Sequence, residues 1–126
     1  MDKNLIKQLE ELSFEKRIDT LYSLVINKKL YALSNSGWEV FFYYENDKFY
    51  LSNNGDLVET FDAPDIDIEY MIQEIEKELK NYGCYLISSR IVKEVRLDKL
   101  VEELEQFISA IERIDQMYKD ICFENN

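Results

Sequence analysis

The aromatic segment at residues 38–44 restricts the possible folds more than any other part of the chain. Five of its seven residues are aromatic, and aromatic and β-branched side chains favour strands. A polar run at 45–48 and an apolar run at 49–52 follow it. This order predicts an antiparallel hairpin.

The predicted strand at 38–44 has two faces with different side chains, because successive residues of a strand point to opposite sides. One face carries Trp38, Val40, Phe42 and Tyr44, and the other carries Phe41 and Tyr43. One face belongs to the core. The other is covered by a helix, forms a homo-oligomer interface or binds a partner, since exposed tyrosine is typical of protein interfaces.

Other segments continue the strand-like pattern on both sides of this hairpin. Predicted strands or short apolar runs are residues 20–26, 30–33, 84–88 and 91–95, with the last two turning at Ser89-Arg90. Residues 57–61 predict either an edge strand or the start of a helix.

Three segments have the apolar spacing of amphipathic helices. They are residues 2–16, with an end or kink at Ser13 and Phe14, residues 65–80, with Asp65 or Asp67 as the N-cap, and residues 97–121. Asp2 is a predicted N-cap, and Gly83 is placed to end the second helix, since glycine accepts the left-handed conformation. The tail after the last helix is expected to fray.

Strands and helices are segregated along the chain more than they alternate, which predicts an α+β fold. We expect a mostly antiparallel sheet packed by an N-terminal helix, a middle helix and a long C-terminal helix. The length of 126 residues fits one domain over residues 1–126.

The charge balance restricts the partners. There are 26 acidic and 15 basic residues and no histidine, which gives a formal charge of −11. Such a surface repels phosphates and anionic membranes, so we expect no direct nucleic-acid binding and no membrane binding. It favours a basic protein, and many basic proteins bind nucleic acids.

The chain also lacks targeting signals. No apolar stretch is long enough to cross a bilayer, and the N-terminus has no signal-peptide pattern. We therefore expect a cytoplasmic protein, in which Cys84 and Cys122 remain thiols.

The residues needed for common catalytic sites are missing. Without histidine, serine and cysteine triads cannot form within one chain, and three scattered glycines make no phosphate-binding loop. We expect no catalytic residues, no cofactor and no enzyme activity. Carboxylates between 56 and 69 leave a small metal-dependent hydrolase as an alternative, but their spacing is not that of an EF-hand.

Carboxylates also line the outward sides of the two later helices and the loop before them. The predicted partner-binding residues are Asp62, Asp65, Asp67, Glu69, Glu74 and Glu76, with Tyr43 and Tyr44. The acids Glu102, Glu103, Glu105, Glu112 and Asp115 of the last helix are expected to extend this acidic face. Rows of carboxylates on two helices could imitate the phosphates of a nucleic-acid duplex.

Three segments resemble a known family. They are the strand and turn at 49–56, the helix end Leu79-Lys80-Asn81-Tyr82-Gly83, and the helical segment 104–111. Together they resemble an uncharacterised bacterial and phage family, known as domain of unknown function 1828, over roughly residues 38–118. The family's acidic turn is replaced here by Ser52-Asn53-Asn54-Gly55. The resemblance implies a phage or mobile-element association and brings no catalytic residues.

The sequence therefore leads to a first hypothesis and two alternatives. The first is an acidic binding or inhibitor protein that docks on a basic, nucleic-acid-handling protein in a bacterial host cell. A nucleic-acid mimic, an anti-defence inhibitor and an anti-CRISPR protein are forms of it. The alternatives are an assembly subunit acting as a homo-oligomer, including a possible homodimer, and the small metal-dependent hydrolase.

Overall fold

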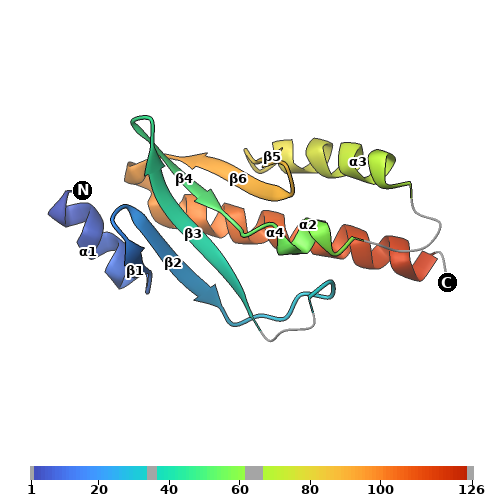
Figure 1. Cartoon of the computed structure of the whole chain (residues 1–126), viewed down its shortest axis with the longest axis horizontal. Helices are drawn as coiled ribbons and strands as arrows, with labels where there is room; N and C mark the ends of the chain where they lie inside the picture. Colours follow the sequence, from blue (N-terminus) through green and yellow to red (C-terminus); the bar gives the residue numbers. More distant parts are fainter. Residues whose placement is uncertain (1, 34–36, 62–66, 125–126) are drawn as a thin grey trace.

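Six strands form one antiparallel sheet in the order β1-β2-β3-β4-β6-β5 (Figure 1). The computed structural model describes residues 2–33, 37–61 and 67–124. The strands are β1 (Glu15–Ile18), β2 (Leu21–Ile26), β3 (Trp38–Glu45), β4 (Lys48–Ser52), β5 (Tyr85–Ile87) and β6 (Arg90–Val95). The prediction of an α+β fold with a mostly antiparallel sheet is confirmed.

The helices pack against one side of this sheet. They are α1 (Lys3–Glu11), α2 (Asp56–Glu59), α3 (Ile68–Lys80), the short 3-10 helix η1 (Leu97–Lys99) and α4 (Leu100–Glu124). Figure 1 shows α4 crossing behind the strands. α4 contacts β6, and α3 contacts both α4 and β5. Among the described residues, none of the helices is both long and apolar enough to cross a lipid bilayer.

The register of β3 fixes which aromatic side chains enter the core. Phe42 lies opposite Tyr22 of β2 and Leu51 of β4, so these three residues share one face of the sheet. All three are almost fully buried. The predicted assignment of side chains to the two faces of β3 is therefore confirmed for the middle of the strand. The face with Phe42 is the core face, and the face with Phe41 points away from the helices.

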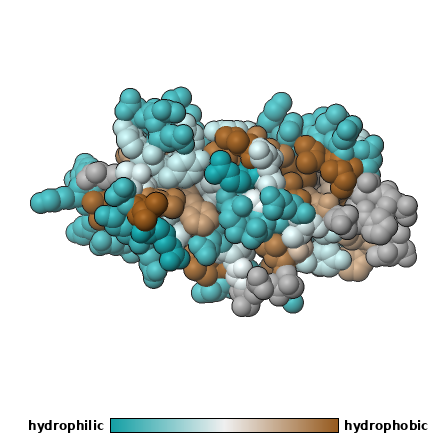
Figure 2. All heavy atoms as spheres, viewed as in Figure 1, coloured by the Kyte–Doolittle hydropathy of each residue, from teal (hydrophilic) through white to brown (hydrophobic). Residues whose placement is uncertain are grey.

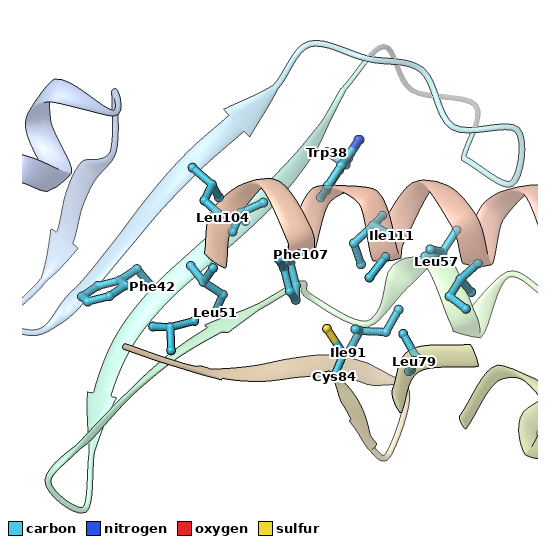
Figure 3. Packing of buried hydrophobic residues seen from close by; sticks show 14 of the residues in the cluster. Trp38, Phe42, Leu51, Leu57, Leu79, Cys84, Ile91, Leu104, Phe107 and Ile111 are labelled. Carbon is cyan, nitrogen blue, oxygen red and sulfur yellow. The ribbon is translucent and has the colours of Figure 1, made fainter. Parts of the chain in front are cut away.

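The hydrophobic core lies between this face and α4. Figure 3 shows Phe107 and Ile111 pointing from α4 toward the strands. Both are fully buried, as are Leu51 of β4 and Ile91 of β6. α1 closes one end of the core, because its Leu5 and Leu9 belong to the same cluster.

The N-terminal helix ends at Glu11, so the predicted span of residues 2–16 is too long, while the predicted break at Ser13 and Phe14 is confirmed. Ser13 adopts a left-handed backbone conformation with φ +72°, which ends the helix. Phe14 then turns into the core, where its ring lies 6.3 Å from that of Phe42. The next four residues form the edge strand β1. Four exposed residues have no periodicity from which a strand could be predicted.

The other helix ends differ less from the sequence prediction. α3 starts at Ile68 after its N-cap Asp67, which confirms one of the two predicted N-caps. Gly83 has φ +70° and ends this segment as expected. Residues 56–59 form α2, which confirms the helical alternative for this segment. α4 continues to Glu124, so the expected fraying of the tail 123–126 is wrong for Phe123 and Glu124, while Asn125 and Asn126 lie outside the described residues.

Candidate protein-binding surfaces

Charged residues are divided unequally between the sheet and the two long helices. The six strands contain four acidic and five basic residues, whereas α3 and α4 together contain eleven acidic and four basic residues. The strands therefore carry a formal charge of +1, and α3 with α4 carries −7 of the total of −11. We call α3 and α4 together the acidic helix layer.

Several glutamates of the acidic helix layer are exposed, and no ion pair is found for them among the described residues. They include Glu69 and Glu76 of α3 and Glu102 and Glu105 of α4. The last two line a shallow concavity of about 530 Å³ with Tyr82 from the end of α3. These carboxylates are available to a partner with a basic surface.

Other acids of this layer are partly neutralised by neighbouring cations. Glu74 lies 3.2 Å from Lys77, one turn along α3. Glu78 accepts a hydrogen bond of 3.1 Å from the Arg113 guanidinium, which joins α3 to α4. Exposed ion pairs contribute little stability, but they lower the negative charge that a partner would meet.

Two acids that were expected to face outward point inward, so that prediction is wrong for Glu103 and Asp115. Asp115 is 8% exposed, and the Glu103 side chain is 15% exposed. Asp115 lies four residues after the buried Ile111, and Glu103 lies three residues after the buried Leu100. Residues at these spacings share one helix face, so the sequence did contain the signal for their burial.

Glu103 belongs to a buried ion pair that connects α4 to the sheet. Its partner is Lys93 of β6, whose side chain is 6% exposed, with Nζ 3.7 Å from the Glu103 carboxylate. The same Nζ donates a hydrogen bond of 2.7 Å to the carbonyl oxygen of Tyr82. One ammonium group therefore holds the end of α3, strand β6 and α4 in place, which positions the acidic helix layer.

Asp115 fixes the loop between β2 and β3 against α4. Its two carboxylate oxygens accept hydrogen bonds from the backbone N–H groups of Tyr31 at 2.7 Å and Ala32 at 2.9 Å. Both oxygens are thus engaged within the fold. This role is structural, and Asp115 is not available for docking.

The structure distributes the acids predicted for partner binding between several roles. Glu69 and Glu76 are exposed, but Asp67 accepts a hydrogen bond from the Tyr70 N–H as the N-cap of α3. Asp62 and Asp65 lie outside the described residues.

The two predicted tyrosines lie on opposite faces of β3. Tyr43 is on the face away from the helices, where its ring stacks on that of Tyr50 at 5.3 Å. Tyr44 is on the other face near the hairpin turn, packs on Phe49, and donates a hydrogen bond of 2.7 Å to Asp47. Tyr43 and Tyr44 therefore cannot belong to the same contact surface.

The face away from the helices is a second candidate surface, which we call the outer sheet face. It carries Val25, Phe41, Tyr43, Tyr50, Tyr85, Ile87, Arg90 and Val92. In the view of Figure 1, Figure 2 shows brown and pale atoms over the strands, with teal atoms both among them and at the edges. The sequence alone places only Phe41 and Tyr43 together on one face; the pairing of β3 with β2 and β4, and of β4 with β6, adds the other residues.

The centre of the outer sheet face is hollowed. A concavity of about 510 Å³ is lined by Phe41, Tyr43, Ser52, Glu45 and Arg90, among others. Burial raises the pKa of Tyr43, and the nearby Arg90 opposes this shift. Tyr43 is therefore a neutral hydrogen-bonding group at neutral pH.

The chemistry available elsewhere is limited. Within the described residues, no group of three histidine, cysteine, aspartate or glutamate side chains could hold a metal ion. Cys84 and Cys122 are unpaired, as predicted. Burial raises the pKa of Cys84 to about 11, so its thiol is protonated at neutral pH and is a poor nucleophile.

Comparisons with known proteins find no match: no family model, no curated protein and no solved structure is similar to this chain. The resemblance to the bacterial and phage family therefore stays a prediction, and function has to be argued from the two surfaces.

Proposed function

We propose that this chain is a non-catalytic binding protein that docks its acidic helix layer on a basic protein. The observation that supports this proposal is the segregation of charge. α3 and α4 carry −7, while the six strands carry +1. A charge concentrated on one side of a molecule steers an oppositely charged partner to that side.

The spacing of the exposed carboxylates suits a partner that binds nucleic acid. Glu102 and Glu105 are three residues apart, a rise of about 4.5 Å along a helix, and Glu69 and Glu76 are seven apart, about 10.5 Å. Lysine and arginine side chains that bind a row of phosphates could pair with such carboxylates. A nucleic-acid mimic that inhibits a host enzyme, as a phage-encoded anti-defence protein would, is one form of this proposal.

The experiment compares two double charge reversals with the same net charge. Glu102→Lys with Glu105→Lys changes the acidic helix layer. Glu10→Lys with Glu11→Lys changes two exposed acids of α1, away from both candidate surfaces, and is the matched control. Each variant is immobilised, exposed to nuclease-treated bacterial lysate at low and high salt, and the captured proteins are identified by mass spectrometry.

We expect the unmodified chain and the α1 variant to capture the same basic protein at low salt, and the variant of the acidic helix layer to lose it. Salt should weaken the capture, because exposed charge pairs are screened. Capture that survives the reversal in the acidic helix layer, or that both reversals abolish equally, contradicts docking through the acidic helix layer.

A further inference from the structure

We propose that two copies of this chain associate through their outer sheet faces. None of the described helices covers this face, and several of its apolar side chains remain open to solvent. Val25 is 51% exposed, Ile87 is 44% exposed and Tyr85 is 41% exposed. These three residues come from β2 and β5, far apart in the strand order, so the open surface extends across most of the sheet.

The outer sheet face contains the side chains that are enriched at the centres of interfaces, which are tyrosine, phenylalanine and arginine. Phe41, Tyr43, Tyr50, Tyr85 and Arg90 lie on this face. The acids Glu39, Glu45 and Glu94 lie on it as well. Tyr43 and Tyr50 are already ordered by stacking on each other, so little side-chain freedom is lost when they are covered.

Most of the charge around this face is neutralised within the chain. Arg17 lies 3.8 Å from Glu39, and Lys48 lies 3.5 Å from Glu94. The Arg17 guanidinium also donates a hydrogen bond of 2.6 Å to Ser23, which keeps it flat against the sheet. The margin of the face is therefore polar and largely neutralised, while its central concavity carries one acid, Glu45, and one base, Arg90.

This distribution of charge favours a second copy of the chain as the partner that binds the outer sheet face. Two chains of charge −11 repel each other less where each presents a near-neutral surface, and the strands together carry +1 against −7 for the acidic helix layer. A basic protein would gain no electrostatic attraction here, whereas the acidic helix layer attracts it. A nucleic acid would meet a chain of net charge −11 with two of the nearby cations already paired.

The outer sheet face also satisfies the requirement of two-fold symmetry. In a symmetric dimer the same patch must complement itself. Arg90 and Glu45 line one concavity and have opposite charges. A two-fold pairing offers each Arg90 the Glu45 of the second copy. Two such sheets would pack as a sandwich with a spacing of about 10 Å, which leaves both acidic helix layers facing outward.

The test uses valine and isoleucine substitutions of similar exposure. Val25→Glu and Ile87→Glu place a charge at either end of the outer sheet face. Val101→Glu is the matched control, because Val101 is 45% exposed but lies on α4. The molar mass of each purified chain is measured by sedimentation equilibrium over a range of concentrations and salt, and circular dichroism confirms that each variant is folded.

We expect the unmodified chain and the Val101 variant to reach twice the mass of the 15.1 kDa chain, and the other two variants to remain monomeric. Added salt should strengthen the dimer, because it screens the repulsion between two negative chains. A monomer at every concentration and salt, or a dimer that both outer-face variants retain, overturns the proposal.

A second measurement needs no variant. Hydroxyl-radical footprinting compares the unmodified chain at low and high concentration. Tyr43, Tyr50 and Tyr85 should become protected as the dimer forms, while Tyr70 of α3, which is 62% exposed, should not change. Equal protection of all four tyrosines, or none, contradicts association through this face. The outcome is independent of partner capture by the acidic helix layer, which weakens with salt.

Discussion

Replacement of Glu103 by glutamine tests whether the buried ion pair holds the acidic helix layer on the sheet. The substitution keeps the size of the side chain and removes its charge. The Lys93 ammonium, with a side chain only 6% exposed, would then lack its carboxylate at 3.7 Å. It would keep its hydrogen bond to the carbonyl of Tyr82. The expected result is a folded but clearly destabilised protein.

The size of the effect follows from the burial of the two partners. Removal of one partner of a buried ion pair costs about 3–5 kcal/mol, because the remaining charge is left uncompensated. The Glu103 side chain is 15% exposed, so the pair is partly hydrated. We therefore expect the free energy of unfolding to fall by about 3 kcal/mol, the lower end of that range. For a chain of this size, such a loss lowers the thermal midpoint by roughly 10 °C.

Urea denaturation at pH 7, followed by far-ultraviolet circular dichroism, measures this change. Glu102→Gln is the matched control, since Glu102 is exposed, and it should change the free energy by less than about 0.5 kcal/mol. The double variant Lys93→Met with Glu103→Leu removes both charges and should recover most of the lost stability, because an apolar pair of similar volume often replaces a buried ion pair without cost. If Glu103→Gln and Glu102→Gln have the same small effect, the pair does not stabilise the fold.

Two further predictions concern other buried polar groups. Asp115→Asn should lower the free energy of unfolding by about 2 kcal/mol, because an amide can accept only one of the two backbone N–H groups that Asp115 holds; the exposed Asp120→Asn in the same denaturation assay should change little. The pKa of Cys84 is raised from 9.0 to about 11 in the folded chain, so its neutral thiol favours folding below pH 9 and this contribution is lost as the pH rises toward 11. Unfolding measured between pH 8 and 11 should show this decline, and Cys84→Ala should reduce it; an unchanged decline in that variant contradicts the assignment to Cys84.

The parts of the fold that could be predicted from the sequence are those with a strong repeat in hydrophobicity. The alternation along Trp38–Glu45 correctly divides Phe42 from Phe41 and Tyr43, because a strand that is half buried must place apolar residues at every second position. The stripe of α4 is equally clear, since one face of a long helix must be apolar to cover a sheet. The edge strand Glu15–Ile18 has four exposed residues and therefore no such pattern.

The candidate surfaces depend on facts that are not local in sequence. Tyr50 and Tyr85 belong to one surface only because β6 lies between β4 and β5, and no spacing along the chain specifies that order. Glu103 shows the opposite case. Its three-residue distance from Leu100 places it on the buried face of α4, yet charged residues are seldom buried without a partner. That partner, Lys93, comes from β6 and becomes evident only in the structure.

The separation of charge and aromatic surface onto opposite sides of the molecule gives the two proposals a common physical test. Docking of the acidic helix layer is an attraction between unlike charges, so it weakens as salt increases. Pairing of outer sheet faces has to overcome the repulsion of two chains of charge −11, so it strengthens with salt.

If both proposals hold, a dimer would present two acidic helix layers to a basic partner at once, and the second contact would form at the high effective concentration set by the first. Ile87→Glu should then weaken capture of the partner without touching the acidic helix layer, and it should do so most at intermediate salt, where dimer and docking coexist. A variant that is monomeric yet captures the partner with unchanged affinity at every salt concentration would show that the two surfaces work independently.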